Sequence, residues 1–186
     1  MSGSLKRAFG LWVASKVSGL HVYANDLANV VQKFPACSVT ELAHSTEKFG
    51  CGRRDFEDRD TETGHVSAFG KMLRADTTFR LIVKIPSGPN GSGQESVDSI
   101  IEQLGLDVTE AGMLWAALDM VDTATTPNTT FPIDHISVEG RQSLSPDVSS
   151  EPFLFQGALT IKITRTLALA KSVENVIERI HLDSGG

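Results

Sequence analysis

The stretch LRADTTFRLIVKI, residues 73–85, alternates between apolar and polar side chains. One set of alternate positions holds Leu73, Ala75, Thr77, Phe79, Leu81, Val83 and Ile85. The other set is mostly polar, with Arg74, Asp76, Thr78, Arg80 and Lys84. Alternation with a period of two predicts a strand with one buried and one wet face, which is typical of an antiparallel sheet. Pro86 follows the stretch and predicts its end, because proline cannot donate a ladder hydrogen bond.

Further strands are predicted on both sides of this one. The strongest alternates Phe153, Phe155, Leu159, Ile161 and Ile163 with Gln156, Thr160, Lys162 and Thr164. Weaker patterns predict strands over residues 36–45 and 133–138. The intervening TATTPNTTFP, residues 123–132, is rich in threonine and proline and predicts a loop.

Helical spacing accounts for three other segments. The first helix buries Leu5, Ala8, Phe9, Trp12, Val13 and Val17, with Ser4 as its N-cap and Gly19 just beyond its end. The second carries Val97, Ile100, Ile101 and Leu104 and is expected to end at Gly105. A C-terminal helix is expected at about residues 171–182, from Val173, Val176, Ile177 and Ile180.

The order of these elements predicts an α+β fold, a mostly antiparallel sheet with amphipathic helices packed on one face. The length of 186 residues favours a single domain over residues 1–186, with its core in about residues 5–169. The net charge of −6 argues against a dedicated nucleic-acid binder, although a negative surface would let DNA pass without sticking. No apolar run is long enough to predict a membrane span.

The segment CGRRDFEDRDTETGH, residues 51–65, holds three arginines, five acids and one histidine. As an enzyme site it would use Asp55, Glu57, Asp58, Asp60 or Glu62 as general acid and base or as ligands of a divalent cation. Such roles need a dry, concave setting, whereas Phe56 is the only large apolar residue here. Interleaved charge in a long connection between strands favours a hairpin loop that contacts another subunit. The expected interface residues are Arg53, Arg54, Asp55, Glu57, Asp58 and Arg59.

No other motif predicts catalysis, a metal site or a cofactor. The five histidines form no HExxH or HxH pair, and neither Cys37 nor Cys51 lies in a CxxC motif. Two cysteines are too few to form a disulfide framework. The glycine-rich loop at residues 87–93 lacks the lysine of a phosphate-binding loop. The sequence therefore predicts neither an enzyme nor a cofactor protein.

Five segments together resemble the tail terminator, or tail completion, proteins of long-tailed bacteriophages. They are GLHVYAND, FPACSVTEL, TFRLIVKIPS, ESVDSIIEQLGL and PFLFQGALTIKITRTLAL, and the resemblance covers about residues 5–169. It implies a hexameric ring in the virion neck, made in the host cytoplasm, that caps the tail tube and receives the head connector while DNA passes its lumen. The expected C-terminal helix exceeds that core and leaves a variant neck role open. The alternatives are a small cytosolic enzyme using the acids of residues 51–65, and an adaptor domain that forms no ring.

Overall fold

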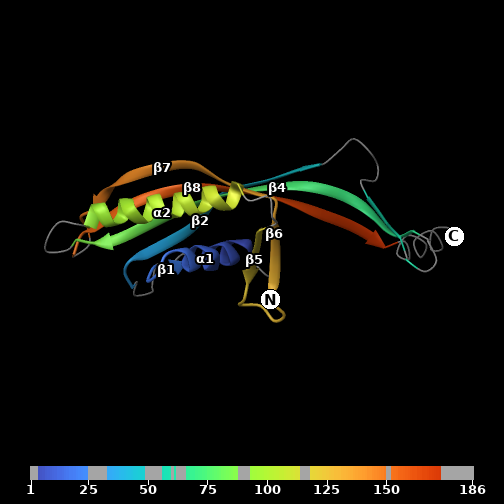
Figure 1. Cartoon of the computed structure of the whole chain (residues 1–186), viewed down its shortest axis with the longest axis horizontal. Helices are drawn as coiled ribbons and strands as arrows, with labels where there is room; N and C mark the ends of the chain where they lie inside the picture. Colours follow the sequence, from blue (N-terminus) through green and yellow to red (C-terminus); the bar gives the residue numbers. More distant parts are fainter. Residues whose placement is uncertain are drawn as a thin grey trace, which may run out of the picture. The chain divides into compact units, whose positions relative to one another are not determined.

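A computed structural model describes residues 4–24, 33–48, 56–59, 61, 66–87, 93–113, 118–149 and 152–172. The chain divides into two compact units. Unit 1 comprises Met1–His44 and Asp76–Thr164, and unit 2 comprises Ser45–Ala75 and Arg165–Gly186. The described elements confirm the expected α+β fold, with long strands and two helices among these residues (Figure 1).

The main sheet has the strand order β1-β2-β4-β8-β7, with β3 paired to β4. Its strands are β1 (His21–Tyr23), β2 (Ala36–Lys48), β3 (Phe56–Arg59), β4 (Val66–Pro86), β7 (His135–Asp147) and β8 (Leu154–Ser172). The pairs β3–β4 and β7–β8 are antiparallel, but β1 runs parallel to β2, so the sheet is mixed.

Strands β4 and β8 are antiparallel neighbours at the centre of the sheet. The Ser87 amide donates to the Phe153 carbonyl (2.8 Å), and the Thr164 hydroxyl donates to Asp76 (2.7 Å). Between these two contacts the residue number rises along β4 while it falls along β8, so the two strands are antiparallel. The predicted faces of β4 are confirmed, because Ala75, Thr77, Phe79, Leu81 and Val83 are buried while their neighbours are not.

Helix α1 (Leu5–Lys16) begins and ends as its sequence predicts. The Ser4 side chain accepts a hydrogen bond from the Arg7 amide, and Gly19 adopts a φ of 78° just beyond the helix. A positive φ costs glycine little because it lacks a Cβ. The helix buries Phe9, whose ring stacks on Phe79 of β4 with centroids 5.0 Å apart. Helix α1 therefore packs on the apolar face of the sheet.

Helix α2 (Gly93–Met113) is longer than predicted, because Gly105 lies in its interior instead of ending it. A Cβ at Gly105 would lie 2.7 Å from Cζ of Arg141 on β7, so the glycine allows close contact between helix and strand. Val97 and Ile101 of the same helix lie over Gly157 of β8. Gly157 lies next to the buried Ala158 and Leu159 of β8.

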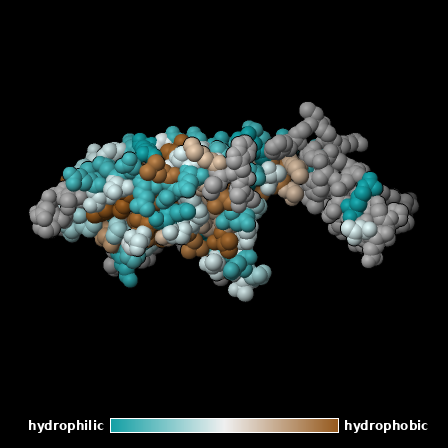
Figure 2. Space-filling model, viewed as in Figure 1, coloured by the Kyte–Doolittle hydropathy of each residue, from teal (hydrophilic) through white to brown (hydrophobic). Residues whose placement is uncertain are grey.

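Both helices cover the same face of the sheet. Phe79 contacts α1, and Gly157 lies against α2. Both residues occupy the alternate positions that carry the apolar side chains of β4 and β8. The opposite face carries mostly polar side chains on these strands and is covered by no helix among the described residues. Figure 2, in the same view as Figure 1, shows hydrophobic residues reaching the surface below α2 and near β5 and β6.

Two predicted boundaries between residues 118 and 147 are wrong. Strands β5 (Leu118–Asp122) and β6 (Thr129–Ile133) form a separate antiparallel hairpin, so residues 129–132 are not loop. Threonine and phenylalanine favour strands, and Pro132 is tolerated in this two-stranded hairpin, so pairing with β5 forms a strand where the proline alone suggested a loop. The strand expected at 133–138 is divided at Asp134, and β7 continues to Asp147 against β8.

The C-terminal expectation is corrected in part. Strand β8 runs through Lys171 and Ser172, so the first two residues of the expected helix are strand. The rest of the expected helix, residues 173–182, lies outside the described residues.

Candidate assembly surface

The outer half of β2 is the most exposed strand segment in the described chain. Residues 36, 37 and 39 are buried, but residues 41–48 are exposed without interruption. Leu42 is 52% exposed within this run. A strand inside a single folded domain normally buries at least one face, so a run of eight exposed strand residues is unusual.

One edge of this strand is largely unpaired among the described residues. Strand β1 pairs only with residues Ala36, Cys37 and Ser38 of β2. Beyond residue 38 the sheet order places no strand on that edge, whereas β4 lies on the other. Free N–H and C=O groups on a strand edge are a template for pairing with another chain.

The predicted interface residues fall partly within the described structure. Arg53, Arg54 and Asp55 lie outside it. Glu57 and Asp58 lie in β3, where their backbones pair with Phe69 and Ala68 of β4.

Arg59 is exposed and follows a shift in the register between β3 and β4. The pairing of β3 with β4 has the antiparallel geometry of a hairpin, as expected for this charged segment. Its role as a subunit interface remains a prediction.

The sheet face opposite the helices carries a polar network that spans three strands. Asp76 on β4 accepts a hydrogen bond from Thr164 and forms an ion pair with Lys162, both on β8 (2.7 and 2.9 Å). Arg80 on β4 donates to Gln142 on β7 (3.1 Å). These contacts connect β4 to its neighbour β8 and, across β8, to β7 on the face that no described helix covers.

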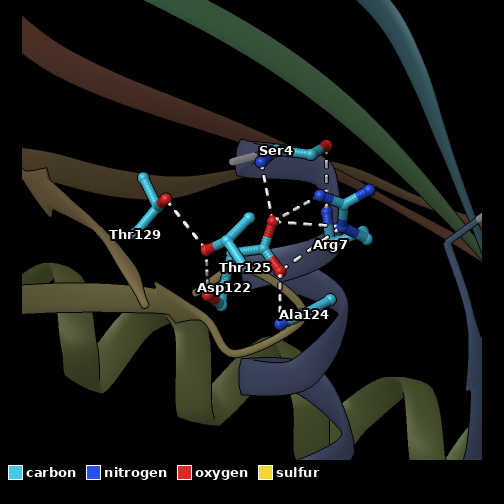
Figure 3. Close-up of polar contacts among 6 residues, drawn as sticks. All are labelled: Ser4, Arg7, Asp122, Ala124, Thr125 and Thr129. Atoms are coloured by element: carbon cyan, nitrogen blue, oxygen red, sulfur yellow. Dashed lines mark hydrogen bonds and ion pairs between the residues drawn. The ribbon is translucent and has the colours of Figure 1, made fainter. Parts of the chain in front are cut away.

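A carboxylate on the helix side fixes the start of α1. Asp122, at the end of β5, is fully buried and accepts hydrogen bonds from the Ser4 amide (2.7 Å) and from Nε and Nη2 of Arg7 (3.0 and 2.8 Å) (Figure 3). The Ala124 amide donates to its other oxygen (3.1 Å). The hydrogen bonds from Arg7, then from Ser4, lower the pKa of Asp122 to about 2.

The same residue organises the turn that follows β5. The Thr125 hydroxyl donates to the Asp122 carbonyl (3.1 Å) and lies 3.0 Å from the Thr129 hydroxyl (Figure 3). Every acceptor of the carboxylate is thus engaged in holding α1 to the β5–β6 hairpin. No local pattern in the sequence signals this contact, because Arg7 and Asp122 are 115 residues apart. A structural role accounts for all of its interactions.

A shallow pocket of about 270 Å³ lies beside this carboxylate. Its wall is mostly small and apolar, from Gly10, Leu11, Ala14, Val22 and Ala24, with Arg7, Asp122, Thr123 and Ala124 at one end. Leu11 is 46% exposed. The two charged groups at its end already bind each other, so the pocket offers a ligand mainly apolar contact.

Among the described residues, no three His, Cys, Asp or Glu side chains lie close enough together to hold a metal ion. Asp55, Asp60 and Glu62, which the metal hypothesis would use, lie outside them. Cys37 is fully buried, and burial raises the pKa of its thiol to about 12. A thiol with this pKa is a poor nucleophile at neutral pH.

Comparison with known proteins found no matching family model and no matching curated protein. Neither helix in the described part of the chain is long and apolar enough to cross a membrane.

Proposed function

We propose that the protein is a subunit of a bacteriophage tail terminator or related neck ring. In this role it caps the finished tail tube with one face and presents the other to the head connector. Its work is geometric, not catalytic, since ending polymerisation requires a ring with two different faces and no bond to be made or broken. The particle that contains it is the virion, assembled in the host cytoplasm.

The exposed outer half of β2 is the observation that carries this proposal. Residues 41–48 are exposed, and no described strand pairs with that edge beyond residue 38. A chain that functions alone gains nothing from such a strand and risks uncontrolled aggregation. A subunit whose neighbour covers the strand has a use for it. The resemblance over residues 5–169 selects a phage ring among such assemblies.

Charge is consistent with the same role. The net charge of −6 would limit adhesion of DNA that passes through a lumen. The interleaved charges of residues 51–65 suit an orienting contact with the next subunit or the adjoining ring, because charged pairs at an interface set its register. Within this interface we expect Arg53 and Arg54 to make the main contacts, since a guanidinium binds a carboxylate with two parallel hydrogen bonds.

The test measures the mass and shape of the purified protein, by light scattering and by electron microscopy. A closed ring is expected, and a monomer at all concentrations would exclude the proposal. In a second arm, Arg53→Glu with Arg54→Glu should leave the circular dichroism spectrum unchanged but impair ring formation or docking to the tube. Lys6→Glu with Lys33→Glu makes the same change in net charge elsewhere and should assemble normally. Normal assembly and docking by both double variants would remove residues 51–65 from the interface.

A further inference from the structure

The main sheet has two different edges, and each includes a stretch without a strand partner among the described residues. At one end, β2 has no described partner on its outer side beyond residue 38. At the other, β7 is the last strand and pairs only with β8. A ring of identical subunits requires two different complementary surfaces on each copy, because a head-to-tail contact joins unlike patches.

The backbone direction along β2 follows from its pairing with β1. The His21 amide donates to the Pro35 carbonyl (2.9 Å), so the backbone groups of Pro35 point toward β1. Successive residues of a strand present these groups to alternate edges. In continuation of this alternation, Val39 directs its N–H and C=O groups to the edge that β1 leaves open, and its side chain lies on the helix side, next to α1. The His44 side chain lies on the same side of the sheet, 2.9 Å from the Thr77 hydroxyl. Val39 and His44 would lie on opposite faces of a regular strand, so the alternation shifts between them and His44 also directs its peptide groups to the open edge.

Strand β7 offers a matching segment. Its register against β8 shifts after Val138 and again after Leu144, but residues 140–144 pair with residues 156–160 in continuous register. Residues 141–143 are exposed within that segment. Regular pairing on the inner side keeps the outer edge straight, so its free peptide groups can be matched by another strand.

We propose that the open edge of β2 in one copy pairs with the outer edge of β7 in the next copy, so that the sheet continues from subunit to subunit. This inference rests on the proposed ring and names the contact that builds it. Pairing of β2 with β2 of another copy would close as a dimer and could not continue into a ring.

Cysteine cross-linking tests the contact in a Cys51→Ser background, where buried Cys37 is the remaining native thiol. Ala43→Cys protein is mixed with differently tagged Ser143→Cys or Gln142→Cys protein and oxidised. Adjacent residues on β7 sample both faces of the strand. A disulfide between unlike chains is expected with one of the two β7 variants. Disulfides only between two Ala43→Cys chains, or none, would overturn the proposed pairing.

The two proposals fail separately. Rings without a β2–β7 disulfide contradict the pairing and leave the ring function intact. The disulfide in open filaments or pairs, without closed rings, supports the pairing and contradicts the ring.

Discussion

Gly157 on β8 should not tolerate even a methyl group. A Cβ there would lie 2.7 Å from Cγ1 of Val97 and 3.2 Å from Cγ1 of Ile101, both on α2. These separations are too short for carbon atoms, so Gly157→Ala must displace the helix or force its side chains from their rotamers. Overpacking of this kind costs about 1–3 kcal/mol of unfolding free energy.

Gly140 on β7 supplies the matched control, because a Cβ there would meet nothing within 4 Å. Glycine inside a strand is less stable than alanine by roughly 0.5–1 kcal/mol, so Gly140→Ala should stabilise the protein. The two glycine-to-alanine changes are therefore expected to have opposite signs. A third variant, Val97→Ala with Gly157→Ala, removes the methyl groups that clash. Its loss of stability should be smaller than the sum of the single losses, by roughly 0.5–3 kcal/mol.

The measurement is urea denaturation followed by circular dichroism, at two protein concentrations so that any stability due to assembly is recognised. The slopes should agree among variants, because a change in slope would indicate a change in the states compared. If Gly157→Ala is neutral or stabilising, or if the double variant is additive, α2 does not rest on β8 at this point.

Three further outcomes follow from buried groups. Leu81→Ala or Ile161→Ala should each cost about 2–5 kcal/mol in the same denaturation assay, because both side chains are fully buried, and a cost below about 1 kcal/mol would contradict the assigned strand faces. The lowered pKa of Asp122, about 2 against an ordinary 3.8, means that its contribution to stability is complete above pH 3.8 and is lost as the pH falls toward 2. Asp122→Asn should therefore flatten melting temperature against pH over that window, and an unchanged acid limb would assign the loss to other groups. In a Cys51→Ser variant, Cys37 should resist alkylation at pH 8 until urea unfolds the protein, since burial raises its pKa to about 12; rapid labelling of the folded protein would refute its burial.

The alternating sequences of β4 and β8 predicted their faces because each strand buries one side against the helices. The end of α2 was predicted wrongly because the role of Gly105 depends on a tertiary contact that the local sequence does not show. Gly105 resembles a helix terminator, but it is needed for the approach of Arg141, and Gly112 has a similar function against the Ile136 carbonyl. The contact between Arg7 and Asp122 is equally hidden, because a carboxylate after a short strand has no signature until the fold brings α1 to it.

The limits of the alternating pattern are themselves informative about assembly. In β2 the alternation of Cys37 and Val39 gives way to Glu41-Leu42-Ala43-His44, at the point where burial ends in the structure. Hydrophobic alternation in a strand indicates burial within the folded chain itself. A strand that pairs through its edge with another copy uses peptide groups, which every sequence has, and needs no apolar stripe. The strand predicted over residues 36–45 is confirmed and extends to Lys48, but no apolar stripe marks its exposed outer half. If copies pair through these strand edges, no apolar pattern in the sequence marks the interface, because backbone groups make the contact rather than side chains.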